Sequence, residues 1–227
     1  MKLSDRLKRL ADLIEKYKKG DVLADIGTDH AYLPCYLVEN KIISKAYACD
    51  VSQGPYESSL STISKHHLID QVEALLGDGL EPILDKKVDM ITIAGMGSYL
   101  IGDILEKNRQ YIKDDHLLFL QPNANTDHLR QYLFSHGFMI VDELLVKEGH
   151  HIYDMMVVKK SHYIADEYDI EFGPILKNKK TELFIEKWKK QYVVYQNIMK
   201  GLSLNHPRYE ELKHKIEMIE VILDESL

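Results

Sequence analysis

Residues 25–34 read Asp-Ile-Gly-Thr-Asp-His-Ala-Tyr-Leu-Pro and follow a short apolar run at 22–24. The apolar run predicts a buried strand, and residues 31–39 predict a helix that tolerates Pro34 because this proline falls in its first turn. A glycine turn between a strand and a helix is typical of nucleotide-binding α/β folds. The stretch therefore predicts such a fold, with a ligand at the end of the strand.

The turn lacks two of the three glycines of a dinucleotide fingerprint. In the spacing G-x-G-x-x-G only Gly27 is present, while Asp29 and Tyr32 stand where the second and third glycines belong. A carboxylate at this point would repel a pyrophosphate but could attract a cation. Because S-adenosylmethionine has no phosphate and carries an ammonium and a sulfonium, the turn favours this methyl donor over NAD.

Apolar runs and helical stretches alternate from residue 22 to about residue 136. The expected strands are 22–27, 46–51, 72–77, 88–94 and 117–121. Helices are expected between most of them, notably at 55–67, 99–107 and 127–136. This alternation predicts an α/β fold with a Rossmann-like, mostly parallel sheet and helices on both faces. Ligands of such sheets bind outside the carboxyl ends of the strands.

The pattern changes after residue 137. Two extended runs, 138–147 and 152–159, are separated only by Glu148-Gly149-His150-His151. They predict an antiparallel hairpin that closes the sheet. A parallel sheet with such a terminal hairpin is typical of class I S-adenosylmethionine-dependent methyltransferases. We therefore expect residues 1–160 to form an S-adenosylmethionine-binding methyltransferase domain.

Residues 161–227 are expected to form a second, helical unit. Residues 161–173 predict an acidic link, and the chain reads as helical from Pro174 onward, with a break at 201–207. Apolar side chains recur every three or four residues on both sides of the break, at Phe184, Trp188, Tyr192, Tyr195 and Met199 and then at Leu212, Ile216, Ile219 and Leu223. This spacing predicts an antiparallel helical coiled-coil hairpin. Its aromatic stripe is interpreted as core packing, with a base-stacking surface as the alternative.

The charge distribution leaves two interpretations open. The formal net charge of −7 argues against nucleic-acid binding by the chain as a whole. Residues 1–20, however, carry seven Lys or Arg against three acids, and residues 177–190 carry six Lys against two Glu, which gives +4 in each segment. These segments could follow a phosphate backbone, or they could be solvated helix faces.

The remaining composition indicates a cytoplasmic protein. No run of about 18 apolar residues is present, and residues 1–9 lack the apolar centre of a signal peptide. Cys35 and Cys49 fall in expected core elements without metal-ligand spacing. We therefore expect reduced core cysteines, no membrane segment and no metal.

Acidic residues follow the second and third strands. Asp50 lies 23 residues after Gly27, and an acid at about this separation accepts the ribose hydroxyls of a bound nucleotide. Asp78 lies beside the same crevice and could accept a hydrogen bond from an adenine amino group. Each has a simpler alternative: Asp50 could cap the turn before Gln53, and Gly77-Asp78-Gly79 could be an ordinary turn.

The fourth and fifth strands end in glycines and amides. Residues 93–98 read Ile-Ala-Gly-Met-Gly-Ser, where the glycines allow close approach to the backbone and Ser98 suits a helix N-cap. Gln121-Pro122-Asn123 supplies two amides that could read the edge of a base. Alternatively, Pro122 ends the strand and Asn123 caps a helix.

Together, the motifs at 25–34, 93–97 and 121–123 resemble those of the bacterial tRNA adenine-N1 methyltransferases that modify adenine 22. The resemblance covers the whole chain. One departure is Ser98, where a third small residue, usually glycine, is expected after Gly95-Met96-Gly97. It implies S-adenosylmethionine as donor, tRNA as partner and N1-methyladenine as product. The cofactor-binding residues inferred from the resemblance and the strand ends are Asp25, Gly27, Asp50, Val51, Asp78, Gly79, Gly95 and Met96.

Three residues are candidates for catalysis. Adenine N1 can attack a sulfonium methyl with its in-plane lone pair, so alignment matters more than a strong base. Asp29 and the side-chain oxygen of Asn123 are candidate acceptors for the adenine amino group, and His30 is a candidate proton acceptor. Two alternatives to a tRNA methyltransferase remain. The protein could methylate a small molecule or another protein, or it could be a non-catalytic RNA-binding module. The oligomeric state stays open, with a monomer expected.

Overall fold

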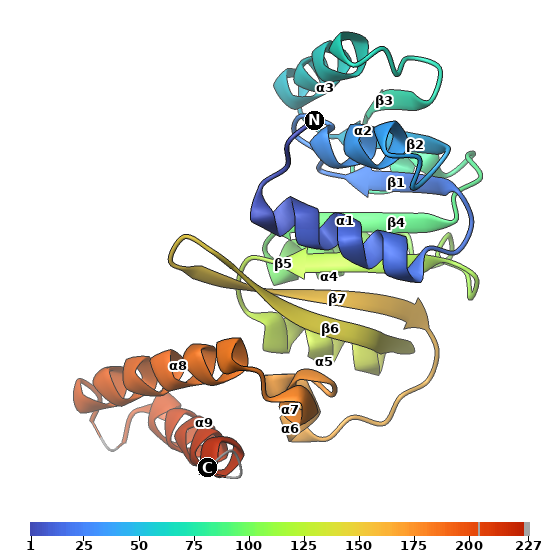
Figure 1. The fold of residues 1–227 in the computed structure, drawn as a ribbon. Coiled ribbons are helices and arrows are strands. Elements are labelled where there is room, and N and C mark those ends of the chain that lie inside the picture. Colours follow the sequence, from blue (N-terminus) through green and yellow to red (C-terminus); the bar gives the residue numbers. More distant parts are fainter. Residues whose placement is uncertain (204, 225–227) are drawn as a thin grey trace.

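The computed structural model describes residues 1–203 and 205–224, and its framework is a seven-stranded sheet. The strands are β1 (Val22–Ile26), β2 (Lys45–Asp50), β3 (Val72–Leu76), β4 (Met90–Met96), β5 (Leu117–Pro122), β6 (Phe138–Glu148) and β7 (His151–Lys160). Their order across the sheet is β3-β2-β1-β4-β5-β7-β6 (Figure 1). Neighbouring strands from β1 to β5 pair in parallel, whereas β7 is antiparallel to both β5 and β6. The predicted fold with its antiparallel terminal hairpin is confirmed.

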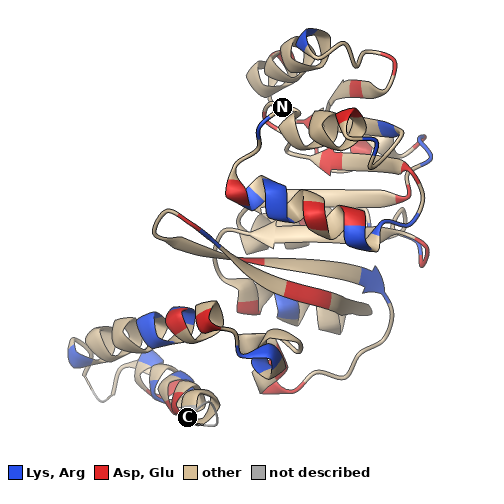
Figure 2. Ribbon diagram, in the orientation of Figure 1, with Lys and Arg blue, Asp and Glu red and all other residues tan. Residues whose placement is uncertain are grey.

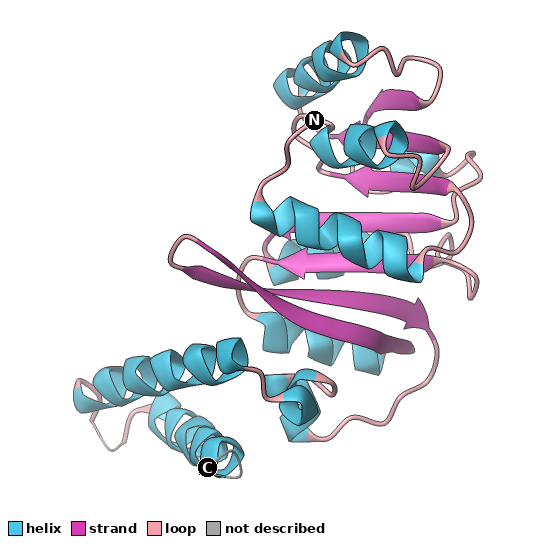
Figure 3. Ribbon diagram, viewed as in Figure 1, coloured by secondary structure: helices cyan, strands magenta, loops and turns pink. Residues whose placement is uncertain are grey.

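Helices cover both faces of the sheet (Figure 3). They are α1 (Asp5–Tyr17), α2 (Tyr32–Glu39), α3 (Gln53–Lys65), α4 (Ser98–Lys107) and α5 (Thr126–Ser135), with the short 3-10 helix η1 (Glu81–Ile83) after β3. Buried side chains of α1, α2 and α3 share one hydrophobic core, while those of α4 and α5 share a second one. Side chains on both faces of the strands are therefore buried, one face in each core. This burial explains why the strand sequences are almost continuously apolar.

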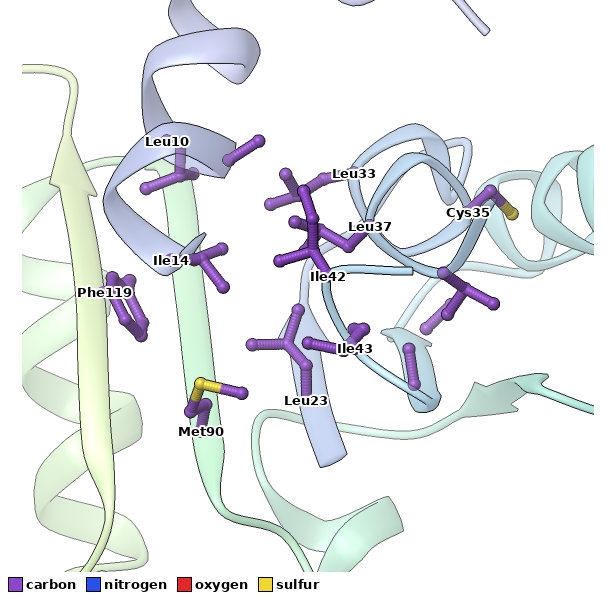
Figure 4. Close-up of a cluster of buried hydrophobic side chains, with 14 of the residues drawn as sticks. Leu10, Ile14, Leu23, Leu33, Cys35, Leu37, Ile42, Ile43, Met90 and Phe119 are labelled. Atoms are coloured by element: carbon purple, nitrogen blue, oxygen red, sulfur yellow. The ribbon is translucent and has the colours of Figure 1, made fainter. Parts of the chain in front are cut away.

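The N-terminal helix is part of the first core. Leu10 and Ile14 of α1 lie with Met90 and Phe119 in this core (Figure 4), and all four side chains are fully buried. Ser4 caps the helix, because its side chain accepts a hydrogen bond from the backbone N–H of Leu7. The first turn of α1 lies next to the carboxyl end of β5, where Arg6 donates a hydrogen bond to Gln121.

Helical structure begins earlier at the C-terminal end than the sequence predicts. The predicted acidic link at 161–173 contains α6 (Glu167–Phe172), so that prediction is wrong in part. Asp166 and Asp169 form a reciprocal capping box, in which each side chain accepts a hydrogen bond from the other's backbone N–H. The acids therefore start a helix, whose Phe172 is fully buried. A further short helix, α7 (Leu176–Lys179), follows.

The last two helices are α8 (Glu182–Lys200) and α9 (Pro207–Asp224), and they pack against each other. Phe184 and Trp188 are buried in a third core, where the Trp188 ring meets Phe172 edge-on with centroids 4.5 Å apart. Core packing is thus confirmed for the first part of the aromatic stripe. From α9 the buried positions include Met218 and Ile222 rather than the predicted Ile216, which is only half-buried.

A helical hairpin is therefore present, and its supercoiling into a coiled coil stays a prediction. Leu204, within the predicted break at 201–207, and residues 225–227 lie outside the described residues. In the part of the chain that is described, no helix is long and apolar enough to cross a membrane.

Buried charges join the C-terminal helices to the sheet. Arg130 of α5 is fully buried and donates hydrogen bonds to Glu143 at 2.9 Å, to Asp154 at 3.0 Å and to the carbonyl of Glu171 at 3.0 Å. Lys187 of α8 also pairs with Asp154. Burial opposes ionisation, but Lys187 and Arg130 together hold the pKa of Asp154 below its ordinary value.

Part of each basic segment is neutralised within the protein. Lys16 of α1 and Lys179 of α7 both pair with Asp142. Although burial acts against it, hydrogen bonds from Lys179, Tyr17 and Lys16 lower the pKa of Asp142 to about 2. Basic and acidic residues are likewise interspersed along α1 and α8 (Figure 2). A role in following phosphates therefore stays a prediction for the lysines that remain exposed.

Candidate active site

The carboxyl ends of β1 and β4 border a pocket of about 260 Å³. Among the residues that line it are five of the predicted site residues, Asp25, Gly27, Asp29, His30 and Gly95. Arg6, from the first turn of α1, also lines it. The structure therefore brings part of the predicted cofactor set together with two of the three candidate catalytic residues.

The turn after β1 adopts a conformation that few side chains tolerate. Gly27 has φ +72°, and a Cβ added there would lie 2.0 Å from Cε of Met96. Asp29 and Ala31, which are not glycines, also have positive φ, at 56° and 54°. Such residues cost of order 1–3 kcal/mol each and are concentrated at functional sites. The turn is held by neighbouring structure, including a 2.8 Å hydrogen bond from Gly27 N to the Cys49 carbonyl.

Asp25 places a nearly buried carboxyl group in the wall of the pocket. Burial raises its pKa to about 7, against the opposing effects of the Thr28 hydroxyl, which donates a hydrogen bond at 2.7 Å, and of the Arg6 charge. A carboxylate in such a position gains stability from a cationic or hydrogen-bond-donating ligand. Asp25 is therefore suited to bind an ammonium group.

The sequence motifs do not reveal Arg6 as a site residue. Its guanidinium donates a hydrogen bond to Gln121, and its Nε lies 3.7 Å from a carboxylate oxygen of Glu148. The available signal is helical spacing: Arg6, Leu10 and Ile14 are four residues apart, so one face of α1 both enters the core and reaches the pocket.

A chain of hydrogen bonds orients Asn123. Arg6 and the Gly95 N–H can only donate, so Gln121 Oε1, which contacts both, must be the acceptor. Gln121 Nε2 then donates to Asn123 Oδ1 at 3.2 Å, and Asn123 Nδ2 donates to the Gly95 carbonyl at 2.7 Å. Because an amide oxygen has two lone pairs, Asn123 Oδ1 can accept a further hydrogen bond.

The helix caps beside this network differ from two expectations. The N-cap of α4 is Gly97, and Ser98 instead is buried and donates its hydroxyl hydrogen to the Ala124 carbonyl, so its prediction as N-cap is wrong. The N-cap of α5 is Asn125, which excludes Asn123 as the helix cap.

Asp29 and His30 lie at the open side of the pocket. The Asp29 side chain is 69% exposed, and its Oδ2 lies 3.4 Å from His30 Nε2. The His30 ring stacks on Tyr32 with centroids 5.1 Å apart. Asp29 and His30 can therefore reach a ligand that enters from solvent.

Asp50 caps a turn, which is the simpler of the two roles considered from the sequence, and its role in binding a ribose stays a prediction. Its Oδ1 accepts a 2.9 Å hydrogen bond from Ser52 N, which caps the turn, and its Oδ2 lies 3.4 Å from Asp29 N in the glycine turn. Next to it, the Val51 side chain is exposed to solvent. An exposed apolar side chain beside a carboxylate can bind a base and its ribose.

Asp78 does not line the pocket at β1 and β4. Its carboxylate accepts a 2.7 Å hydrogen bond from Lys107, and Gly79 follows with φ +54°. Gly77 N donates to the Asp50 carbonyl at 2.9 Å, so the turn lies next to the end of β2. Their role in binding a cofactor stays a prediction.

The residues present fit S-adenosylmethionine. A guanidinium from Arg6 and carboxylates from Asp25 and Asp29 line one pocket, which is the complementary set for the carboxylate and ammonium of an amino acid. The pocket is slightly below the usual volume of a small-molecule site, so it suits part of such a ligand. Within the described residues, no cluster of three His, Cys, Asp or Glu side chains could hold a metal ion.

Comparison with known proteins identifies close relatives. The profile of the tRNA (adenine(22)-N(1))-methyltransferase family matches residues 23–221. A tRNA (adenine(22)-N(1))-methyltransferase of Bacillus subtilis is 34% identical over 99% of this chain and 98% of its own length. A Streptococcus pneumoniae structure in complex with S-adenosyl-L-methionine has a TM-score of 0.90 and 34% identity, over 98% of this chain and 100% of the other. An M. capricolum structure in complex with S-adenosyl-homocysteine has a TM-score of 0.86 and 33% identity, over 98% of each chain.

Proposed function

The chain belongs to the family of tRNA (adenine(22)-N(1))-methyltransferases, and we propose from this premise that it transfers a methyl group from S-adenosylmethionine to N1 of adenine 22 in tRNA. The observation that best supports this activity is the hydrogen-bonded series from Arg6 through Gln121 to Asn123. It orients an amide oxygen beside the pocket that contains Asp25 and Asp29.

We assign the methyl donor to the carboxyl ends of β1, β2 and β4. In this assignment Asp25 accepts from the donor's ammonium, Arg6 binds its carboxylate, and Asp50 accepts from its ribose hydroxyls. Gly27 and Gly95 allow the donor to approach the backbone closely, because neither carries a side chain. The remaining proposed contacts are Val51, Asp78, Gly79 and Met96.

The chemistry requires alignment and charge stabilisation. When bound, the donor supplies an electrophilic methyl group on a sulfonium that leaves as a neutral thioether. The new N–C bond uses the N1 lone pair, so the positive charge moves to the adenine ring. Asp29, with its negative charge, and Asn123 Oδ1 accept hydrogen bonds from the adenine amino group as this charge develops. His30, beside Asp29, accepts the proton if that amino group loses one.

The proposal divides the work between two parts of the chain. Residues 1–160 bind the donor and carry out the transfer, and residues 161–227 bind tRNA. Figure 1 supports this division, because α8 and α9 extend toward the side of the molecule at which β1 and β5 have their carboxyl ends. A tRNA substrate places the activity in the cytoplasm, and a monomer is proposed as the active form.

Nucleoside analysis tests the function directly. The protein is incubated with donor labelled in the methyl group and with a tRNA transcript, which is then digested to nucleosides. We expect label in N1-methyladenosine, and none when adenine 22 of the transcript is replaced by guanine. Label in another nucleoside would refute the assignment to adenine N1.

Donor-binding and tRNA-binding assays, carried out beside the nucleoside analysis, separate the alternatives. Donor binding without label in any nucleoside would favour a small-molecule or protein methyltransferase. Binding of tRNA without any methyl transfer would favour a non-catalytic RNA-binding module. Light scattering of the purified protein, with and without tRNA, decides the oligomeric state.

A further inference from the structure

Two adjoining hollows separate α5 from the helical hairpin. One, of about 320 Å³, is lined by Pro122 and Asn123 at the end of β5 and by residues of α8. The other, of about 580 Å³, lies between α5, α8 and α9. They share Asn125, Asp127, Gln191 and Tyr195, so they form one interdomain cleft that begins at the candidate active site.

The lining of the interdomain cleft is rich in amides and rings. Asn125 and Gln131 contribute exposed amides from α5 and its N-cap. Opposite them, Gln191 and Tyr195 of α8 line both hollows. Tyr99, 58% exposed at the start of α4, packs against the His128 ring in a tilted arrangement with centroids 3.9 Å apart. Amides can pair with the edges of bases, and rings can stack on their faces.

The charged side chains that line the interdomain cleft show no excess of cations: the bases are Lys187, Arg208 and Lys215, and the acids are Asp127, Asp154, Glu171 and Glu211. Lys215 pairs with Asp127 and Glu171, each at 2.9 Å, and Lys187 pairs with Asp154. A surface that attracts phosphates needs an excess of unpaired cations. The interdomain cleft therefore suits the neutral, polar part of a nucleotide, which is its base.

The same ion pairs hold the walls of the interdomain cleft in place. Lys187 belongs to α8 and Lys215 to α9, whereas Asp154 and Asp127 belong to β7 and α5. Both lysine side chains are mostly buried, with 22% and 19% of their surface exposed. A preformed cleft loses less conformational freedom on binding than a mobile one.

We propose that the interdomain cleft binds an unpaired nucleobase next to the target adenine in the tRNA, and that Gln191 and Asn125 read this base. The proposal rests on the proposed function, because the cleft begins at Asn123. It adds a second base-recognition site to that function. It also gives the helical hairpin a role in specificity in addition to charge-based attraction.

The test measures tRNA affinity by fluorescence anisotropy at several salt concentrations. Gln191→Leu removes the amide from the cleft, and Gln196→Leu, on the same helix but outside the cleft lining, is the matched control. Asn125→Gly removes the second amide and keeps the left-handed backbone at φ 54°. Donor affinity and melting temperature are measured for each variant to show that the fold is intact.

We expect Gln191→Leu and Asn125→Gly to weaken tRNA binding about fivefold to hundredfold, as loss of a base contact does. The slope of log K against log salt should not change, because no phosphate contact is lost. Two transcripts, each with an abasic residue on one side of the target adenine, identify the base. One of them should bind the wild-type protein more weakly than the intact transcript does. The same transcript should bind both variants as tightly as the intact transcript does.

Affinity within twofold of Gln196→Leu for both variants would overturn the proposal. A reduction of the salt slope by about one would also overturn it, since this indicates a phosphate contact. These outcomes differ from failure of the proposed function, in which wild type itself forms no N1-methyladenosine.

Discussion

Replacing Arg130 by methionine should destabilise the junction between the sheet and the C-terminal helices. Arg130 and Glu143 each have only 1% of the side chain exposed, and Asp154 has 5%. Arg130→Met keeps an apolar stem of similar length but leaves the Glu143 carboxylate without its cation. Asp154 keeps Lys187, so one buried charge rather than two becomes uncompensated.

The expected loss is about 3–5 kcal/mol, which is the usual cost of breaking a buried ion pair by removing one partner. Lost hydrogen bonds to the carbonyls of Ile170 and Glu171 act in the same direction. Typical stabilities are about 5–15 kcal/mol, so the variant should still fold. With a urea m-value of about 3 kcal/mol per M, the unfolding midpoint should fall by about 1–2 M.

Urea unfolding followed by two signals checks this expectation. Trp188 is the single tryptophan and lies in the third core, so its fluorescence reports the C-terminal helices, while circular dichroism reports the whole fold. In Arg130→Met, the midpoint of the Trp188 fluorescence transition should shift to lower urea concentration by at least as much as the midpoint of the circular dichroism transition. Lys190→Met is the control, because it breaks an exposed pair with Glu186 on the same helix and should cost under about 1 kcal/mol.

A second substitution separates charge from packing. If the uncompensated carboxylate is the cause, adding Glu143→Gln to Arg130→Met should recover part of the lost stability, since a neutral amide costs less to bury. A loss below about 1 kcal/mol in the single variant, or no recovery in the double variant, would refute the reasoning.

Three further predictions concern the pocket. Because burial raises the pKa of Asp25 to about 7, protonation below that pH removes the negative charge that binds an ammonium group. Calorimetry should therefore show donor affinity falling up to tenfold per pH unit below pH 7. Asp25→Asn should abolish this pH dependence. Gly27→Ala places a Cβ 2.0 Å from Cε of Met96 on a backbone with φ +72°. The free energy of unfolding, measured with urea, should therefore fall by about 1–2 kcal/mol, and donor binding should weaken. Wild-type values for both would contradict the strained turn. In Asp29→Asn, the asparagine tolerates the left-handed backbone at this position. The substitution should lower kcat for tRNA about 100-fold and change donor affinity by no more than about threefold. An unchanged kcat would remove Asp29 from the mechanism.

Short-range patterns carry much of the fold. Strands buried on both faces need apolar side chains at nearly every position, as at residues 117–120 of β5, so they can be read directly from the sequence. The glycine turn at Gly27 is equally readable, because few other residues adopt its conformation. The segment at 161–173 is less readable, because Asp166 and Asp169 suit an acidic loop as well as a helix cap.

Local sequence patterns are enough to predict the strand–helix alternation, the antiparallel terminal hairpin and the strand-end positions of the candidate site residues. These features depend on neighbours within a few residues along the chain. Long-range packing is what allows Arg6 to orient Asn123 through Gln121, and what joins Lys187 and Lys215 of the helical hairpin to β7 and α5. Arg6 and Gln121 are 115 residues apart, and Lys215 and Asp127 are 88 apart. Such pairs form only when the packing of separate elements brings their side chains together, so no local pattern records them.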